Sequence, residues 1–481
     1  SPLDHYLRSG EMQGRWPNPY FDPAWYLHVH ASKIQDQDQS FGRRPLEHFI
    51  TSGRYNRCDP SPLFSLDHYR RLNLDLVHSD IEPLQHYLQF GIHENRPISK
   101  VPEPINFVPS GKNVYIIDAT YPTPDRDSGS VDAVNLIKLL IFQGYKVYFS
   151  ATAQFSSAAA DEIMLAARRS VVQLGVTIID EHNAVDIEYF IDCYGRNFDL
   201  FILSRVYCGG FYFESVRKFA PDAKIIFNTL DLHGLRERRA AYLHNDRVGL
   251  NRSYGTSERE RYLARLSDAT LVVSVEEQKL LENTAPGARC YTVPLLRDIP
   301  GSKKGFEERR NVAFIGGYKH LPNVDAATFF LDNIWPIVRI KLPNVEFHLV
   351  GADLPEELSG RNDPGLRIVG HIGDLSQELD NVRLTVAPLR YGAGAKGKVV
   401  SSLCYGVPCV ATPIAAEGMS LVHRETALIS RDVAEFADLI IQAYNDQFLW
   451  NLLSDKGMEF VRSRHSMDAG QKYLQDILEN L

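Results

Sequence analysis

Short apolar runs alternate with amphipathic stretches along most of the chain from residue 113 onward. The first run is Asn113-Val-Tyr-Ile-Ile-Asp118, and a helical pattern from Val131 to Phe142 follows it after a loop rich in Gly and Ser. Similar runs predict strands at residues 146–149, 176–179, 200–203, 224–227, 270–273 and 290–293. Apolar runs that alternate with helical patterns predict a parallel sheet with helices packed on it.

A second series of the same kind begins at Asn311, after the polar stretch 297–310. It predicts further strands at residues 345–350, 366–369, 384–387 and 408–411. We therefore predict an α/β chain with two doubly wound, Rossmann-like lobes, residues 111–296 and 311–465, joined by a linker at 297–310. A C-terminal helix at 466–481 is expected to pack back on the first lobe. Two such lobes face a cleft, and ligands bind beyond the carboxyl ends of their strands.

A short motif recurs before the first strand. The segment from Pro2 to Gly10 returns at residues 45–53 and 83–91. A proline in the first turn and a glycine at the end are typical of a short helix. We predict a small α-helical repeat module at residues 1–100 and a linker at 101–110. His5, His48 and His86 recur at one position of the repeat, and we interpret them as packing or hydrogen-bonding residues rather than metal ligands.

Composition narrows the class of protein. The 481 residues carry a net charge of −8, and the 52 Lys and Arg residues are dispersed, which argues against a nucleic-acid partner. Six cysteines without a CxxC pair do not indicate a disulfide scaffold or a zinc module. The apolar runs are far shorter than the ~20 residues of a membrane span. We expect a cytoplasmic protein with no membrane span; peripheral membrane contact, and oligomerisation through the repeat module, are compatible with the sequence.

The densest motif of the second lobe is Gly392-Ala-Gly-Ala-Lys-Gly-Lys398, between an expected strand and an expected helix. Glycines let the backbone approach an anion closely, and the amides and dipole of a helix N-terminus favour negative charge. Lys396 and Lys398 would be unfavourable there without a ligand. We therefore predict a diphosphate site; the alternative is a glycine turn with surface lysines.

The same glycines satisfy the dinucleotide fingerprint Gly-x-Gly-x-x-Gly at residues 392–397. That fingerprint requires an acidic residue about 20 positions on, at the end of the next strand. Here the next strand is followed by Thr412 and Pro413, and no carboxylate occurs before Glu417. This argues against an NAD-dependent oxidoreductase.

Four motifs in order carry a family resemblance. With Gly406-Val-Pro-Cys-Val-Ala-Thr412 and Ala416-Glu-Gly418, the glycine-rich turn resembles the donor site of family 4 retaining glycosyltransferases of GT-B fold. Three further segments are similar to cleft loops of that family: residues 118–130, 231–236 and 314–326. The resemblance covers about residues 112–480. The repeats resemble, more weakly, modules of some bacterial polysaccharide glycosyltransferases.

The resemblance implies a hexosyltransferase that moves a sugar from a nucleotide-sugar donor, such as a UDP- or GDP-sugar, with retention. The acceptor would be a glycan, a lipid-linked glycan or a protein. We expect His233 and Glu417 to be catalytic. The expected donor diphosphate and sugar site comprises Gly129, Ser130, Gly316, Gly317, Lys319, Gly392, Ala393, Gly394, Lys396 and Lys398. The expected nucleoside site comprises Val369, His371, Ile372 and Ser401.

No cofactor and no metal are expected. Asp125-Arg-Asp127 imitates an Asp-x-Asp metal motif, but it precedes a helix start, where Asp commonly serves as a cap. The chain also departs from the family at a Glu-x7-Glu pair, because Ala393 and Ser401 stand at those two positions. Two alternatives therefore stay open: a catalytically decayed glycosyltransferase-like binding or assembly protein, and a GT-B sugar-nucleotide epimerase.

Overall fold

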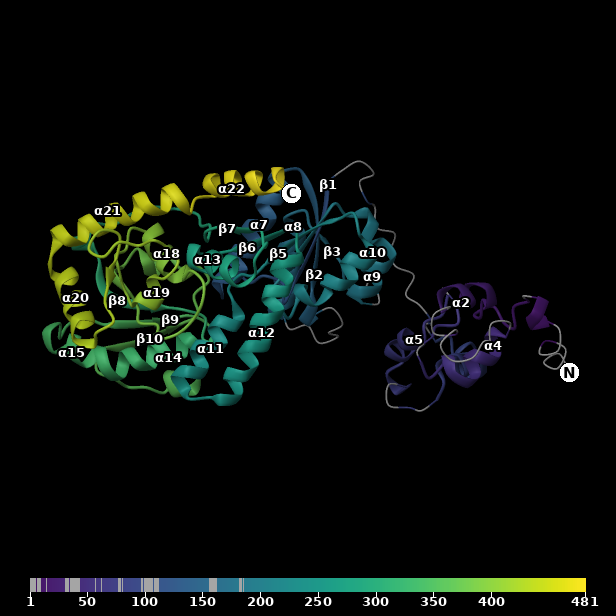
Figure 1. Cartoon of the computed structure of the whole chain (residues 1–481). Coiled ribbons are helices and arrows are strands. Elements are labelled where there is room, and N and C mark those ends of the chain that lie inside the picture. The colour runs from purple at the N-terminus through teal and green to yellow at the C-terminus, as the bar shows by residue number, and fades with distance from the viewer. Residues whose placement is uncertain are drawn as a thin grey trace. The chain divides into compact units, whose positions relative to one another are not determined.

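The computed structural model divides the chain into two compact units (Figure 1). One comprises residues 1–105 with 181–185, and the other 106–180 with 186–481. The structure describes residues 6, 10–13, 15–30, 34, 44–56, 58–61, 63–76, 79, 81–96 and 98 of the first unit, with residue 184, and residues 107, 112–154, 162–180 and 186–481 of the second. Apart from residue 107, the linker predicted at 101–110 lies outside the described residues.

The N-terminal unit is helical in its described part. Its α-helices are α2 (Pro23–Val29), α4 (Pro45–His48), α5 (Leu66–Leu72) and α6 (Pro83–His86). The π-helical turns η4 (Phe49–Gly53) and η6 (Tyr87–Gly91) extend α4 and α6, so the second and third copies of the sequence motif have the same conformation. Most of the first copy, including His5, lies outside the described residues.

Two of the recurring histidines, His48 and His86, are hydrogen-bonded packing residues. His48 Nδ1 lies 2.8 Å from the hydroxyl of Tyr26, and His86 Nδ1 lies 2.9 Å from that of Tyr69. The glycine that ends each motif leaves room for the tyrosine that is bonded to the histidine of that motif. A Cβ added at Gly53, for example, would lie 2.0 Å from the Tyr26 hydroxyl. The repeated residues thus preserve one packing arrangement.

The second unit consists of two lobes. The first, which we call the N-terminal lobe, has a sheet of seven parallel strands in the order β3-β2-β1-β4-β5-β6-β7. The strands are β1 (Lys112–Asp118), β2 (Tyr145–Ala151), β3 (Thr177–Ile178), β4 (Leu200–Ser204), β5 (Lys224–Asn228), β6 (Ala269–Val272) and β7 (Cys290–Thr292). The helices are α7 (Ser128–Phe142), α8 (Glu162–Gln173), α9 (Ile187–Tyr194), α10 (Phe213–Phe219), α11 (His233–His244), α12 (Arg247–Leu266) and α13 (Val275–Thr284). Alternate residues of β1 face opposite layers: Val114 packs in one core with Leu140 of α7, and Tyr115 packs against Phe190 of α9.

The C-terminal lobe has six parallel strands in the order β10-β9-β8-β11-β12-β13. They are β8 (Arg310–Ile315), β9 (Phe347–Val350), β10 (Leu366–Gly370), β11 (Val382–Ala387), β12 (Cys409–Ala411) and β13 (Leu428–Ile429). The helices of this lobe are α14 (Leu321–Phe329), α15 (Trp335–Lys341), α16 (Glu356–Ser359), α17 (Ser376–Leu379), α18 (Gly397–Cys404), α19 (Pro413–Ala416), α20 (Val433–Asn445) and α21 (Gln447–Arg464), and the chain ends with α22 (Met467–Glu479). The predicted pair of wound lobes is confirmed.

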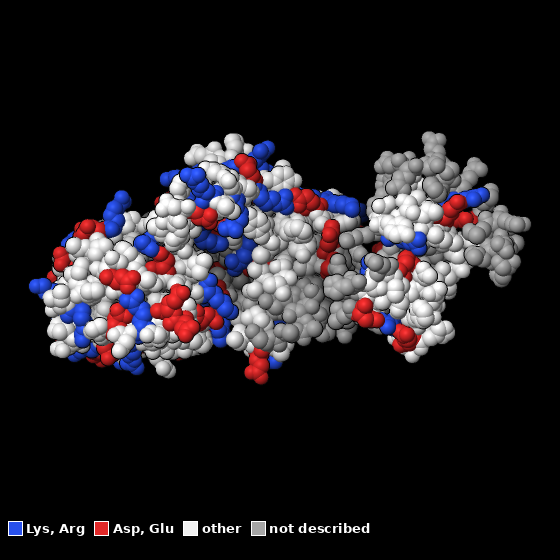
Figure 2. All heavy atoms as spheres, turned by 90° about the horizontal axis from the view of Figure 1, so that it is seen from below, with Lys and Arg blue, Asp and Glu red and all other residues white. Residues whose placement is uncertain are grey.

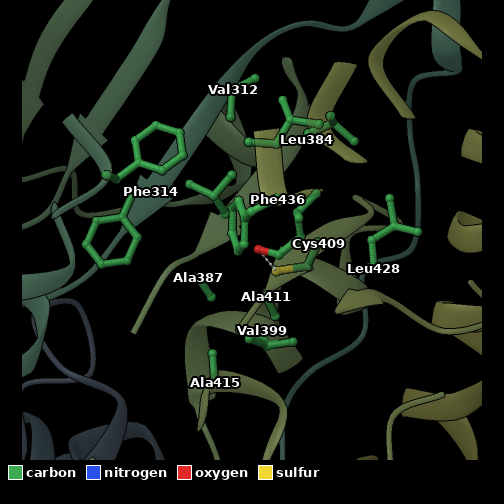
Figure 3. Close-up of a cluster of buried hydrophobic side chains, with 14 of the residues drawn as sticks. Val312, Phe314, Leu384, Ala387, Val399, Cys409, Ala411, Ala415, Leu428 and Phe436 are labelled. Atoms are coloured by element: carbon green, nitrogen blue, oxygen red, sulfur yellow. Dashed lines mark hydrogen bonds between the residues drawn. The ribbon is translucent and has the colours of Figure 1, made fainter. Parts of the chain in front are cut away.

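The core of the C-terminal lobe fixes the start of α18. Val399 and Leu403 of this helix are buried with Leu384 of β11 and Val410 of β12 (Figure 3 shows part of this core). Each fully buried side chain of this kind stabilises the fold by ~1.5–3 kcal/mol. The packing therefore holds the first turn of α18 at the carboxyl end of β11.

The chain crosses between the lobes twice. The first crossing follows β7 and the second lies between α21 and α22, and they meet where Arg297 N donates to His465 O at 2.8 Å. The His465 ring also bonds to Leu295 O, with 2.7 Å between Nδ1 and the oxygen. Beyond this point α22 packs on the N-terminal lobe, where Leu474 and Ile477 join its core.

Among the described residues, no helix combines the length and the apolar character that crossing a bilayer requires.

Candidate active site between the two lobes

A cavity of about 360 Å³ lies between the lobes. One wall comes from the segments after β1, β4, β5 and β7, and the other from the segments after β8, β9, β10 and β11. Because the strands of each sheet are parallel, these segments meet at one edge of each sheet, where wound α/β folds bind their ligands. We call the two surfaces the N-terminal wall and the C-terminal wall.

The turn at residues 392–396 forms part of the C-terminal wall, and its shape depends on two glycines. Gly392 has a φ of 146° and Gly394 a φ of 68°, conformations that residues with a side chain rarely adopt. A Cβ added at Gly397, where α18 begins, would lie 1.8 Å from Ser128 Oγ of the other lobe. The glycines therefore allow both the turn and the close approach of the lobes.

Lys396 and Lys398 follow in this wall and line the cavity. Lys396 Nζ donates to Ala393 O at 2.8 Å; Lys398 Nζ donates to Asn323 Oδ1 at 2.5 Å and lies 4.1 Å from the centre of the Phe314 ring. Within the described part of the chain, neither lysine forms an ion pair with a carboxylate. Burial lowers the pKa of Lys396 to about 8 and that of Lys398 to about 7. The wall thus holds two cations whose desolvation a bound anion would offset.

A second glycine turn ends β8. Gly316 and Gly317 line the cavity, and Asn323 Nδ2 donates to Gly317 O at 2.7 Å, which fixes the shape of the turn. A Cβ added at Gly317 would lie 2.8 Å from Arg126 O of the opposite wall. His320 lies just beyond, and burial lowers its pKa to about 4, so that it is neutral at neutral pH.

The N-terminal wall begins at α7, where two acids have partners within the same wall. Asp127 caps α7 by accepting from Ser130 N at 2.8 Å and from Ser130 Oγ at 2.6 Å. Arg297 donates to Ser128 Oγ at 2.5 Å and forms an ion pair with Asp132, and both of these side chains are largely buried. Each acid of this part of the wall therefore has a partner.

Two neighbouring strands of this lobe end in strained residues that line the cavity. Arg205, after β4, has a φ of 63°, and Leu230, after β5, has a φ of 59°. A residue other than glycine costs on the order of 1–3 kcal/mol in this region, and such strain concentrates at functional sites. Arg205 Nε donates to Asp118 Oδ1 at 2.8 Å, which extends the pattern of paired charges.

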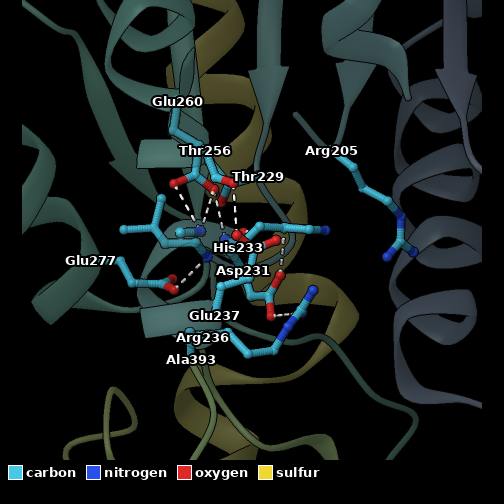
Figure 4. Close-up of polar contacts among 12 residues, drawn as sticks. Arg205, Thr229, Asp231, His233, Arg236, Glu237, Thr256, Glu260, Glu277 and Ala393 are labelled. Carbon is cyan, nitrogen blue, oxygen red and sulfur yellow. Dashed lines mark hydrogen bonds and ion pairs between the residues drawn. The ribbon is translucent and has the colours of Figure 1, made fainter. Parts of the chain in front are cut away.

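Asp231 stands at the centre of the loop between β5 and α11 and lines the cavity (Figure 4). Its Oδ1 lies 3.0 Å from His233 Nδ1, and its Oδ2 accepts from Arg236. Burial would raise the pKa of Asp231, but these two partners hold it well below its ordinary value. For His233, burial would lower the pKa, and the contact with Asp231 outweighs this and raises it.

Two buried glutamates hold the backbone of the same loop (Figure 4). Leu232 N donates to Glu277 Oε1 at 3.0 Å, and His233 N donates to Glu260 Oε1 at 2.6 Å. Burial raises the pKa of each glutamate to about 7. These carboxyl groups, from α13 and α12, satisfy amides at the start of α11, for which Leu232 supplies no side-chain cap.

One side chain of α11 reaches across to the other lobe. Arg239 forms two hydrogen bonds to Glu417, at 2.6 and 2.7 Å, and a third to Gly392 O at 2.7 Å. It therefore ties the N-terminal lobe to the glycine turn. The α11–α12 pair is rich in arginine, and Figure 2 shows basic side chains gathered in the middle of the second unit.

Ten of the sixteen side chains and glycines expected in the site line this cavity. They are Gly129, Gly316, Gly317, His371, Ile372, Gly392, Ala393, Lys396, Lys398 and Ser401.

The other six lie beside the cavity. His233 pairs with Asp231, Glu417 pairs with Arg239, and Ser130 bonds to the cap of α7. Gly394 packs against the opposite lobe, Val369 lies within β10, and Lys319 is 82% exposed, 3.7 Å from Asp353.

The Asp125-Arg-Asp127 segment is engaged in other contacts. Asp127 caps α7, and Asp125 Oδ2 lies 3.2 Å from His371 Nε2 of the other lobe. Within the described ranges, no group of three or more His, Cys, Asp or Glu residues could hold a metal ion.

Several wall residues were not expected from the sequence. Asp231, Arg236 and His320 lie in segments that the family resemblance covers, but the neighbouring His233 and Lys319 had been selected instead. Arg205 and Arg297 belong to no motif. The only local signal for Arg205 is that it directly follows a buried apolar strand, where cleft residues occur.

Two facing lobes with parallel sheets, and a cavity at the carboxyl ends of their strands, define a GT-B fold. Sucrose-phosphate synthase from Thermosynechococcus elongatus shares it, with 12% identity, a TM-score of 0.57, and coverage of 76% of this chain and 98% of that one. HepE of Anabaena, solved with UDP-glucose, is 12% identical with a TM-score of 0.56, covering 77% and 100%. A glycosyltransferase from Rickettsia africae is 10% identical with a TM-score of 0.55, covering 77% and 99%. At these identities the likeness is one of fold.

The sequence of the C-terminal lobe narrows the class. Residues 309–446 match the family described as glycosyl transferases group 1. This range includes the glycine turn, both lysines and Glu417. No curated protein matches the sequence. The C-terminal lobe of this GT-B fold thus carries a glycosyl transferases group 1 domain, and this sequence match supports glycosyl transfer as the activity.

Proposed function

We propose that the protein is a hexosyltransferase that moves a sugar from a nucleotide-sugar donor to a hydroxyl group, with retention at the anomeric carbon. The donor is a UDP- or GDP-type sugar, and the acceptor is a glycan, a lipid-linked glycan or a protein. The reaction uses no metal ion and no further cofactor. The cytoplasmic location expected from the sequence is part of the same proposal.

The observation that carries this proposal is the pair of lysines in the C-terminal wall. Lys396 and Lys398 face the cavity without a carboxylate partner in the described part of the chain, and burial lowers the pKa of both. A diphosphate supplies the missing negative charge through several oxygens, and buried cations bind such groups more strongly than exposed ones do. The group 1 domain match and the UDP-glucose complex of HepE support a nucleotide sugar as the source of that diphosphate.

The proposed reaction exchanges one bond at the anomeric carbon for another. The bond from this carbon to the diphosphate oxygen breaks, and a bond to the acceptor oxygen forms. The acceptor hydroxyl proton moves to the departing phosphate oxygen, which yields a nucleoside diphosphate and a glycoside. Lys396, Lys398 and the amides of the glycine turn stabilise the negative charge that develops on the diphosphate. Entry of the acceptor on the face that the phosphate leaves gives retention.

The nucleoside is proposed to bind between β10 and α18. His371 and Ile372 follow β10, and Ser401 lies in the second turn of α18; all three line the cavity. Backbone groups after β10 are suited to hydrogen-bond the base, and the Ser401 hydroxyl is suited to hydrogen-bond the ribose.

Calorimetric titration with UDP, GDP and ADP tests the proposal. We expect one of them to bind the wild type, and Lys398→Met to weaken it about 10- to 100-fold, since a hydrogen bond to a charged group contributes ~1.5–3 kcal/mol. The matching nucleoside should bind both proteins equally, because it lacks the phosphates.

Lys341→Met is the matched control, because Lys341 is an exposed residue at the end of α15. Binding of none of the three diphosphates would refute the donor site. Equal loss of diphosphate and nucleoside in Lys398→Met would refute its phosphate role. Binding without hydrolysis or transfer would indicate a decayed binding protein, and conversion of a sugar nucleotide to its epimer would indicate an epimerase.

A further inference from the structure

Among the residues that line the cavity, the C-terminal wall has no carboxylate. Ala393 and Ser401 line the cavity beside the glycine turn, and neither side chain can carry a negative charge. Glu417 lies near this turn, but it pairs with Arg239 and does not line the cavity. A sugar that leaves a diphosphate develops positive charge at its anomeric carbon, and its hydroxyl groups need acceptors. An acid that lines the cavity must therefore come from the opposite wall.

Asp231 lies directly across from that turn. A Cβ added at Gly394 would lie 3.1 Å from Asp231 Cβ, and both Asp231 and Ala393 line the cavity. The Asp231 carboxylate thus faces the part of the cavity that adjoins the expected diphosphate site.

The loop that carries Asp231 is held in place by unusual means. Leu230 has a left-handed backbone conformation, although it is not a glycine. The amides of Leu232 and His233 donate to the buried carboxyl groups of Glu277 and Glu260, respectively. Strained backbone and buried acids persist only where the surrounding structure over-determines them. Such a loop presents its side chain with little reorganisation, as a site for a developing charge requires.

The contacts of Asp231 leave it charged and able to accept more hydrogen bonds. His233 contacts one oxygen and Arg236 the other. A carboxylate has about four acceptor positions, so each oxygen keeps one for a sugar hydroxyl. The other acids that line the cavity have different partners: Asp127 caps α7, Asp132 pairs with Arg297, and Asp125 faces His371.

We propose that Asp231 is the carboxylate that binds the hydroxyl groups of the donor sugar and faces the positive charge at its anomeric carbon. The N-terminal lobe thereby supplies the acid that the glycine turn lacks at Ala393. This inference rests on the proposed function, because it requires a sugar attached to the diphosphate. It makes Asp231 a catalytic residue, whereas Glu260 and Glu277 are positioning residues.

The test separates the sugar from the diphosphate. Wild type and Asp231→Asn are titrated with UDP, GDP and ADP, and with UDP-glucose, UDP-galactose, UDP-N-acetylglucosamine, GDP-mannose and ADP-glucose. For the tightest sugar nucleotide, hydrolysis without acceptor is also measured. We expect Asp231→Asn to leave the affinity for the diphosphate unchanged, and to lower both sugar-nucleotide affinity and hydrolysis about 10- to 100-fold.

Glu237→Gln is the control for replacing an acid by its amide. Glu237 lies on α11, accepts from Thr256 Oγ1 at 2.7 Å, and does not line the cavity. The Glu237→Gln variant should match the wild type in its affinity for the nucleotides and in its hydrolysis of the sugar nucleotide. If Asp231→Asn does not fold, Asp231→Glu replaces it in the test, because this variant keeps the negative charge for His233 and Arg236. Its carboxylate is displaced, so it should also lower the rate of hydrolysis while the diphosphate still binds.

The outcomes are distinct. An equal loss of diphosphate and sugar-nucleotide affinity in the Asp231 variants would show that the loop acts only through the shape of the cleft, and would overturn the inference. Unchanged hydrolysis and unchanged sugar-nucleotide affinity would overturn it as well. If the wild type binds none of the nucleotides, the proposed function itself fails, and the inference fails with it.

Discussion

The two walls of the cavity carry charge in opposite ways. In the N-terminal wall, Asp132 is paired with Arg297, Asp231 with Arg236, and Arg205 with Asp118. In the C-terminal wall, Lys396 and Lys398 donate only to uncharged oxygens within the described part of the chain. None of these residues is exposed, so the difference does not come from solvent.

This difference separates charges that are compensated within the protein from charges that await a ligand. A paired ion in a buried wall is satisfied without substrate, and its loss leaves the partner uncompensated. A buried cation without an anion is unfavourable in the empty protein and becomes favourable when an anion binds. Charge pairing therefore distinguishes the wall whose charges are already compensated from the wall that we propose to bind the diphosphate.

The largest expected effect concerns stability and comes from the N-terminal wall. Arg297→Ala leaves Asp132 buried without its cation, and removing one partner of a buried ion pair costs about 3–5 kcal/mol. Thermal and urea unfolding should show this loss. Arg361→Ala, which breaks more exposed ion pairs of the C-terminal lobe, should cost only about 0–1 kcal/mol. Equal destabilisation by the two variants would contradict the description of Arg297 and Asp132 as a buried ion pair on which the N-terminal wall depends.

The second effect is a pH dependence that belongs to the C-terminal wall. In the empty cavity Lys398 loses its proton near pH 7 and Lys396 near pH 8, because burial lowers the pKa of both. A diphosphate raises both pKa values, so binding takes up protons, and affinity falls as pH rises above these values. Each lysine contributes up to about tenfold per pH unit.

Titration of the bound nucleoside diphosphate between about pH 7 and pH 9, in buffers of different ionisation enthalpy, measures this proton uptake. Lys398→Met should reduce the steepness of the pH dependence. An affinity that does not change with pH in the wild type would show that the lysines are already satisfied in the empty protein.

The smallest expected effect concerns Arg239, which joins the two walls. Arg239→Ala removes its bonds to Glu417 and Gly392 O, which are partly exposed, so we expect only about a two- to fivefold loss of diphosphate affinity. Stability should change little. Arg238→Ala, on the same helix but without a contact to the glycine turn, is the control. A loss as large as that of Lys398→Met would mean that the turn depends on the other lobe for its shape.

Most of the fold could be predicted because buried parallel strands are continuous apolar runs. Val114 to Ile117 follows Asn113 and precedes Asp118, and Val312 to Ile315 follows Asn311, so each run can be recognised as a buried strand from the sequence alone. Strand β13 was missed, because two residues are too few to form a pattern. The α11–α12 pair was also missed, because its faces are rich in arginine and its apolar periodicity is weak.

The site could be predicted where one local segment determines the chemistry, and not where distant segments meet. Glycines and lysines within seven residues indicated the anion site, and Lys396 and Lys398 line the cavity. The pairing of Glu417 with Arg239 depends on how the lobes close, which no short segment encodes. The sequence favours His233 because it follows an expected strand and can donate or move a proton; the structure places Asp231 in the wall and His233 beside it.

The meeting of the two crossings, where Arg297 N donates to His465 O, has a mechanical consequence. Helix α21 packs on the C-terminal lobe and α22 on the N-terminal lobe, so any relative movement of the lobes is absorbed between them and in the adjoining linker. Because the two crossings meet at one place, the lobes can rotate about this point, whereas translation of one lobe past the other is resisted. Substrate entry would then proceed by rotation of one lobe relative to the other. After a single cleavage in the 297–310 linker, the crossing between α21 and α22 would still hold the lobes together.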